Sequence, residues 1–138
     1  MKIYFACSIT GGRQDEDIYQ VFVKEMEKMG CEVPTAHIAE TGIEEMDAAE
    51  APGDIYNRDV SWIEESDLLV AEVTTPSHGV GYEIGLALNL GIPVICFYRA
   101  DANISKMILG NPHPDLQIFS YRDQFEAIEL LRQLLTES

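Results

Sequence analysis

One stretch of the chain decides its fold: Thr75-Pro76-Ser77-His78-Gly79-Val80-Gly81-Tyr82-Glu83-Ile84-Gly85. It directly follows the apolar run Leu68 to Val73, which is typical of a buried strand. The Pro-Ser-His-Gly segment indicates a tight turn, and the pattern from Val80 to Leu90 predicts a helix that ends at Gly91. A buried strand, a turn and a helix in this order form the basic unit of an α/β protein with a parallel sheet.

The carboxylate of Glu83 falls on the apolar face of this expected helix. With 3.6 residues per turn, Glu83 shares a face with Val80, Ala87 and Leu90, within the first helical turn. One interpretation is a charge at a helix start that the helix dipole stabilises. The other is a functional acid that points towards the mouth of the sheet.

The rest of the chain repeats the same alternation of strands and helices. Strands are expected at Lys2 to Ala6, Cys31 to Thr35, Leu68 to Val73, Pro93 to Tyr98 and Leu116 to Tyr121. Helical patterns separate them, at about Asp15 to Met29 (before Gly30), Asp54 to Glu65, Val80 to Leu90 and Asp123 to Leu135, with a short helix within Asn103 to Leu109. We therefore predict an α/β fold with a doubly wound, five-stranded parallel sheet, Rossmann-like (flavodoxin-like), with helices on both faces. The irregular stretch Ala36 to Pro52 is interpreted as a flap.

Length and charge narrow the class of protein. A chain of 138 residues fits a single domain, residues 1–138, that buries roughly 68% of its unfolded surface. Nine basic and 24 acidic side chains give a net charge of −15, which argues against binding a nucleic acid polymer. No apolar run approaches a membrane span and no signal-peptide pattern is seen, so we expect a cytoplasmic protein without membrane contact.

Cysteines and histidines give no sign of a metal site or cofactor. The three cysteines lie in or beside apolar strand-like segments and are interpreted as reduced core thiols: Cys7, Cys31 and Cys96. The three histidines share no ligand spacing: His37, His78 and His113. We therefore expect neither a bound metal nor a cofactor.

Two loops at strand ends could hold a small anion. The first strand runs into Cys7-Ser8-Ile9-Thr10-Gly11-Gly12-Arg13, whose backbone N–H groups could cradle a phosphate. Its spacing matches neither the dinucleotide nor the Walker motif, and the two glycines could instead only make a turn. The second loop, Pro76 to Gly79, also ends a strand and opens a helix.

A second inward-facing acid gives Glu83 a candidate partner. Asp59 shares a helix face with Ile55 and Trp62, although it could be a satisfied acid within the helix. Cleavage of a glycosidic bond uses one carboxylate as nucleophile and one as acid, so the pair predicts such chemistry. Tyr4, in the first strand, could reach an acid at the strand tips. Glu72 ranks below both acids, because a strand-end acid is usually solvated.

Four segments resemble a known enzyme family. They are Tyr4 to Arg13, Thr35-Ala36-His37, Asp59-Val60-Ser61-Trp62 and, most specifically, Val70-Ala71-Glu72-Val73 through Gly81-Tyr82-Glu83-Ile84-Gly85. Together they resemble the 2′-deoxynucleoside 5′-phosphate N-hydrolases of the nucleoside 2-deoxyribosyltransferase superfamily. The resemblance implies a doubly wound five-stranded sheet and a homodimer.

The resemblance also implies roles for individual residues. Glu83 matches the family nucleophile, Asp59 the second acid and Tyr4 the tyrosine that positions the nucleophile. The 5′-phosphate contacts match Ser8, Ser77 and Gly79, with Gly11, Gly12 and Arg13 in the same loop as Ser8. His37 matches a position beside the nucleobase, and Ser105 matches a serine that reaches the phosphate in the neighbouring subunit. Thr10 stands where relatives often have arginine, and the loss of such a charged contact typically costs about 1.5 to 3 kcal/mol.

The function expected from these residues is hydrolysis of the N-glycosidic bond of 2′-deoxynucleoside 5′-monophosphates. Glu83 would attack C1′, and water would then release 2-deoxyribose 5-phosphate. Asp59 would protonate the leaving base or only hold the sugar. The alternatives are base exchange by a nucleoside 2-deoxyribosyltransferase, cleavage of ribonucleotides, and a non-catalytic nucleotide-binding module on the same fold.

Overall fold

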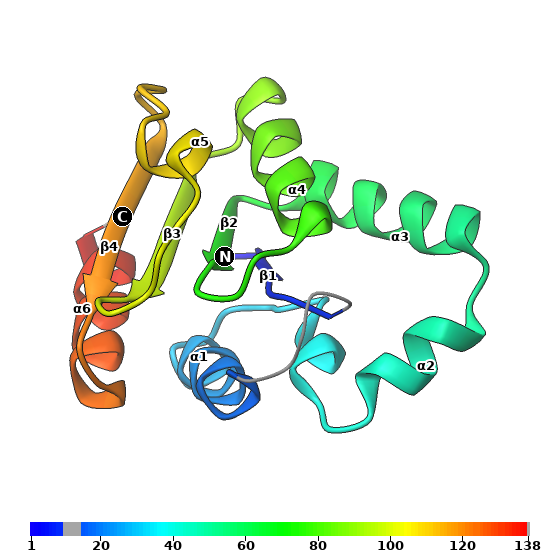
Figure 1. Ribbon diagram of the computed structural model, residues 1–138, viewed down its shortest axis with the longest axis horizontal. Helices are drawn as coiled ribbons and strands as arrows, with labels where there is room; N and C mark the ends of the chain where they lie inside the picture. Colours follow the sequence, from blue (N-terminus) through cyan, green and yellow to red (C-terminus); the bar gives the residue numbers. More distant parts are fainter. Residues whose placement is uncertain (10–14, 138) are drawn as a thin grey trace.

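A computed structural model describes residues 1–9 and 15–137 of the chain (Figure 1). Its described strands form one parallel sheet in the order β1-β2-β3-β4. The strands are β1 (Ile3–Ala6), β2 (Leu68–Glu72), β3 (Val94–Arg99) and β4 (Leu116–Tyr121). Because all four are parallel, their carboxyl ends lie along the same edge of the sheet, where ligands bind in this architecture.

Helices cover both faces of the sheet, as predicted (Figure 1). One face packs against α1 (Glu16–Lys28) and α6 (Gln124–Glu137). The other packs against α3 (Pro52–Glu65), α4 (His78–Asn89) and α5 (Lys106–Leu109). Alternation along β1 divides the core, because Ile3 and Phe5 join the first cluster while Tyr4 and Ala6 join the second.

The prediction of a fifth strand at Cys31 to Thr35 is wrong. This segment makes one isolated parallel bridge, Lys2 with Glu32, on the outer side of β1. Pro34 has no N–H group to continue the ladder. The hydroxyl of Thr35 takes its place, since it accepts a hydrogen bond from the backbone N–H of Phe5 (2.9 Å) and donates one to the Phe5 carbonyl (2.8 Å). A buried side chain therefore satisfies the edge of β1 where a neighbouring strand was expected.

Two further predictions need correction. The stretch interpreted as an irregular flap contains a 3₁₀ helix, η1 (Ala36–Ala39), and a short helix, α2 (Ile43–Ala49). Gly42, with φ of 85°, precedes α2 in the left-handed conformation that glycine accepts. Helix α4 begins two residues earlier than expected, because the hydroxyl of Ser77 accepts a hydrogen bond from the N–H of Val80 (3.3 Å). Glu83 consequently lies in the second turn, beyond the strongest influence of the helix dipole.

A buried acid, Glu72, joins the ends of three strands. Its carboxylate accepts hydrogen bonds from the N–H of Thr74 (2.7 Å), the hydroxyl of Thr74 (2.8 Å) and the hydroxyl of Tyr121. The Thr74 hydroxyl also accepts from the N–H of Arg99 at the end of β3 (2.9 Å). Glu72 is fully buried and not solvated, so it acts as a structural acid that fixes the edge where the strands end.

The same edge is tied to the start of α1. Asp15, which is also buried, pairs with the Arg99 guanidinium and accepts a hydrogen bond from the hydroxyl of Thr75 (2.8 Å). These contacts hold the loop between β2 and α4 against α1 and β3.

The described residues show neither a membrane span nor a metal site. No described helix is long and apolar enough to cross a membrane. Within residues 1–9 and 15–137, no cluster of three or more His, Cys, Asp or Glu could hold a metal ion. None of the three cysteines forms a disulfide, and Cys7 and Cys96 are buried.

We expect Tyr121→Phe to destabilise the protein by about 1 to 3 kcal/mol, because a buried carboxylate loses a donor. Burial raises the pKa of Glu72, and the Tyr121 hydroxyl opposes that rise. A raised folded-state pKa means that stability is lost as pH rises through it, so the defect of the variant should be larger at pH 8 than at pH 5. Urea unfolding at both pH values measures this. Tyr98→Phe on β3 is the matched control, and equal stability of the two variants would contradict the structural role.

Candidate active site

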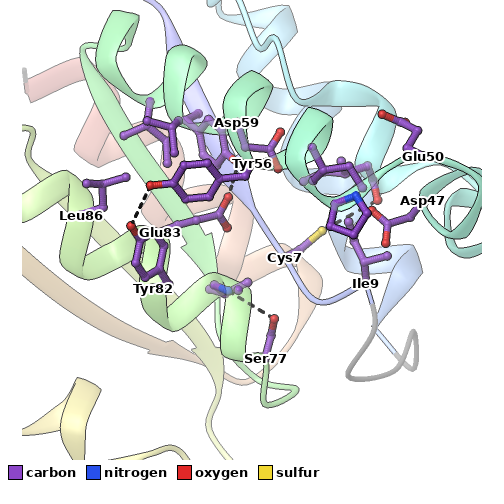
Figure 2. Close-up of a pocket in the computed structure, with 18 of the residues that line it drawn as sticks. Cys7, Ile9, Asp47, Glu50, Tyr56, Asp59, Ser77, Tyr82, Glu83 and Leu86 are labelled. Atoms are coloured by element: carbon purple, nitrogen blue, oxygen red, sulfur yellow. Dashed lines mark hydrogen bonds between the residues drawn. The ribbon is translucent and has the colours of Figure 1, made fainter.

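A cavity of about 550 Å³ opens beside the carboxyl end of β1 (Figure 2). Its walls come from β1 and the residues after it, and from η1, α2, α3 and α4. The lining residues are Tyr4, Cys7, Ile9, Ile38, Asp47, Ala48, Glu50, Pro52, Ile55, Tyr56, Asp59, Val60, Ile63, Ser77, Gly79, Val80, Tyr82, Glu83 and Leu86. A mostly apolar cavity of this size with a few polar groups is typical of a small-molecule site.

Glu83 is the most perturbed acid of the cavity. It projects from α4 and accepts a hydrogen bond from the hydroxyl of Tyr4, which stands on β1, 79 residues away in the chain. Burial raises the pKa of Glu83 from 4.5 to about 7, and the negative charge of Asp59 adds to the rise. The Tyr4 hydrogen bond lowers it. Burial likewise raises the pKa of Tyr4 far above its usual range, so the phenol stays protonated as a donor.

Asp59 lies on α3 and faces the same cavity. One oxygen accepts a hydrogen bond from the Nε of Arg58 (3.0 Å), and Arg58 also pairs with Glu50 at the end of α2 (3.1 Å). The Arg58 guanidinium lies over the ring of Trp62, 5.0 Å from its centroid. Burial raises the pKa of Asp59, while Arg58 and His37 oppose the rise by favouring its charged form.

The structure brings together the residues predicted for chemistry. Tyr4, Asp59 and Glu83 all line the cavity, and so do Ser77 and Gly79 from the start of α4. Figure 2 labels Asp59, Ser77 and Glu83 among these residues. A half-buried carboxylate held by a phenol beside a second acid can attack an electrophilic carbon or exchange a proton near neutral pH.

Other predicted site residues lie outside this cavity. Ser8 is buried directly behind the end of β1, and His37 packs edge-on against Trp62 with ring centroids 5.6 Å apart. Ser105 is exposed at the start of α5, where its hydroxyl accepts from the N–H of Met107 (3.2 Å), and it lines a second cavity on the other side of α4. Predictions for Thr10, Gly11, Gly12 and Arg13 fall outside the described residues.

The sequence reasoning missed several residues of the site. Arg58 precedes Asp59, and neighbours in a helix point in different directions, so the face pattern that found Asp59 gave no signal for it. Asp47 and Glu50 lie in the stretch interpreted as a flap. Tyr56 and Tyr82 come from different helices, α3 and α4, yet their hydroxyls are 3.3 Å apart at the rim of the cavity (Figure 2). Tyr56 lies three residues before Asp59, and residues at this spacing are neighbours on a helix surface. This spacing is the one sequence signal that could have indicated Tyr56, and Tyr82 had none.

The sequence profile of the nucleoside 2-deoxyribosyltransferase family matches residues 3–128. A zebrafish (Danio rerio) protein named 5-hydroxymethyl-dUMP N-hydrolase is 41% identical over 134 residues, which cover 93% of this chain and 92% of the relative. The mouse (Mus musculus) protein of the same name is 39% identical over 128 residues, which cover 89% and 73%. A Methanococcoides burtonii protein, assigned by name to the 2′-deoxynucleoside 5′-phosphate N-hydrolases, is 39% identical over 118 residues, which cover 86% and 97%.

Among solved structures, the CMP N-glycosidase BcmB of Clostridium botulinum is similar with a TM-score of 0.72 and 21% identity. The match covers 96% of this chain and 99% of that one, and at this identity it supports the fold alone. The profile match over most of the chain and the relatives near 40% identity lead to one conclusion: the chain belongs to the nucleoside 2-deoxyribosyltransferase family.

Proposed function

We propose that this enzyme hydrolyses the N-glycosidic bond of 2′-deoxynucleoside 5′-monophosphates, giving a free base and 2-deoxyribose 5-phosphate. The observation that carries the proposal is the carboxylate of Glu83, held by Tyr4 in a cavity with Asp59. Relatives named as N-hydrolases of deoxynucleotides support the reaction class. A single chain of 138 residues supplies all three groups.

The proposed reaction has two displacement steps at C1′. The ionised Glu83 attacks C1′ while the bond from C1′ to the base nitrogen breaks and its electron pair leaves with the base. The product is an ester between deoxyribose and Glu83. Water then attacks C1′ from the opposite face, gives up a proton and releases Glu83 as a carboxylate. The Tyr4 hydroxyl orients Glu83 through both steps.

Asp59 is suited to handle the protons of these steps. Its raised pKa favours the protonated form that a departing base needs, and after departure the same carboxylate can accept a proton from water. Arg58 limits this role, because its hydrogen bond favours the charged form. A carboxylate held by Arg58 could instead accept a hydrogen bond from the sugar.

The 5′-phosphate is expected at the start of α4. Ser77 caps this helix, and Gly79 follows it in the first turn, where free backbone N–H groups favour an anion. Ser8 lies at the end of the neighbouring strand. Ser105 faces away from the cavity in its own chain, so a contact with phosphate would come from a second subunit of a homodimer.

Glu83→Gln should reduce base release by more than about 10³-fold, because the amide cannot attack C1′. The substitution should also stabilise the fold at high pH. The pKa of Glu83 is raised from 4.5 to about 7 in the folded protein. The free energy of unfolding of the wild type therefore falls as pH rises between these values, by about 3 kcal/mol at most, and the variant avoids this loss. Chromatography of released base and urea unfolding at pH 5 and 8 test both effects. Glu64→Gln, an exposed acid of α3, is the control, and full activity of Glu83→Gln would show that the site is wrong.

Tyr4→Phe should move the rising limb of the pH profile to higher pH. In the wild type, kcat/KM should rise towards a plateau above about pH 7 as Glu83 ionises. Since the Tyr4 hydrogen bond lowers the pKa of Glu83, its loss raises that pKa and lowers activity at pH 7 by roughly 5- to 100-fold. Steady-state kinetics from pH 5 to 9 measure the shift. An unmoved midpoint would exclude the positioning role of Tyr4.

Asp59→Asn distinguishes the two roles of the second acid. If Asp59 donates a proton to the leaving base, Asp59→Asn should lower kcat/KM by about 10²- to 10⁴-fold and should remove the fall in activity at high pH. Asp54→Asn, an exposed acid on the same helix, is the control. If the falling limb persists unchanged in Asp59→Asn, Asp59 only holds the sugar.

Adding a foreign base to each reaction tests whether water or a base accepts the sugar, because efficient formation of an exchanged nucleotide would identify a transferase.

A further inference from the structure

The polar groups that line the cavity accept hydrogen bonds more readily than they donate them. Among the described lining residues there are four carboxylates, and none of these residues is a lysine, arginine, histidine, asparagine or glutamine. The carboxylates belong to Asp47, Glu50, Asp59 and Glu83. Carboxylates only accept, so a ligand group that lies against them gains a hydrogen bond only where it brings a donor.

Among the four carboxylates, Asp47 is the one without a hydrogen bond or ion pair to a described residue. Glu83 accepts from Tyr4, and Arg58 neutralises both Asp59 and Glu50. No described residue donates a hydrogen bond to Asp47 or forms an ion pair with it, although the side chain is half-buried on α2. Its negative charge adds to the rise of the Asp59 pKa, and both carboxylates line the same cavity.

The position of Asp47 points to the base and not to the phosphate. Figure 2 shows Asp47 and Glu50 on the opposite side of the cavity from Tyr82 and Leu86, well away from Ser77. A phosphate dianion beside Asp47 would meet like charge. With the phosphate at the start of α4 and C1′ at Glu83, the neutral base is the part of a nucleotide that can approach α2.

We propose that Asp47 reads the base, so that the enzyme prefers deoxynucleotides whose base carries an exocyclic hydrogen-bond donor. Cytosine and adenine present an amino group, and a 5-hydroxymethyl group presents a hydroxyl. Uracil instead has a carbonyl oxygen where cytosine has its amino group, and thymine has a methyl group where the 5-hydroxymethyl base has its hydroxyl. A carbonyl facing a carboxylate loses its hydrogen bond to water and gains no partner. This inference rests on the proposed nucleotide substrate and adds its base preference.

Matched substrates test the inference. The nucleotides dCMP and dUMP differ by an amino group against a carbonyl, and 5-hydroxymethyl-dUMP and dTMP differ by one hydroxyl. We expect the wild-type kcat/KM to favour the donor-bearing member of at least one pair by about 10-fold or more. In Asp47→Asn the side chain can both donate and accept, so this ratio should fall towards one. Glu45→Gln, an exposed acid of α2 outside the cavity, should keep the wild-type ratio.

Equal efficiency of the wild type on both pairs would overturn the inference, and so would an Asp47→Asn variant that keeps the wild-type ratios. Calorimetric binding of the same four nucleotides to Glu83→Gln separates this result from the fate of the proposed reaction. If the protein binds dCMP more tightly than dUMP in an Asp47-dependent way but the wild type releases no base, the hydrolase proposal fails and the base preference stands. If base is released without such a preference, the reverse holds.

Discussion

The parallel register of β1 against β2 is the constraint on which the site depends. Tyr4 pairs with Leu69 in this register, and the alternation of the strand points Tyr4 towards α3 and α4 while Phe5 points towards α1. A slip by one residue would turn Phe5 towards Glu83 and leave the carboxylate without its donor. The core enforces the register, because Phe5 packs against Phe22 with ring centroids 5.9 Å apart. Packing on one face of the sheet thus holds Tyr4 against Glu83 on the other face.

Two acids of this protein, the fully buried Glu72 and the half-buried Glu83, are satisfied to different degrees. Glu72 accepts three hydrogen bonds from Thr74 and Tyr121 and holds strand ends together. Among the described residues, Glu83 accepts one hydrogen bond, from Tyr4, and it faces a cavity. Burial raises the pKa of both, but only Glu83 is placed where a substrate could meet it. A shifted pKa therefore identifies a reactive acid only together with an open approach.

The sequence predicted the features of the fold that the spacing of apolar residues controls. Strand and helix positions, the two-faced sheet and the inward direction of Asp59 and Glu83 follow from spacing. The prediction was wrong where a single side chain bonds the backbone. The Thr35 hydroxyl bonds the backbone of Phe5 where a fifth strand was expected, and the Ser77 cap makes α4 begin earlier than expected. Contacts between segments distant in sequence, such as that of Arg58 with Glu50, leave no periodic trace.

The acidity of the cavity bears on how an anionic substrate could enter it. A pair of like charges 4 Å apart costs about 4 kcal/mol at an effective dielectric constant near 20. A nucleotide bound with its phosphate towards Asp47 would meet such a cost, whereas the opposite orientation places the phosphate among the N–H groups that begin α4. Arg58 pairs with Glu50 and Asp59, so Asp47 is the acid on that side of the cavity whose charge no described residue neutralises. The net charge of −15 argues against a nucleic acid polymer, whereas the arrangement of charge within the cavity favours one orientation of the proposed nucleotide, with C1′ towards Glu83.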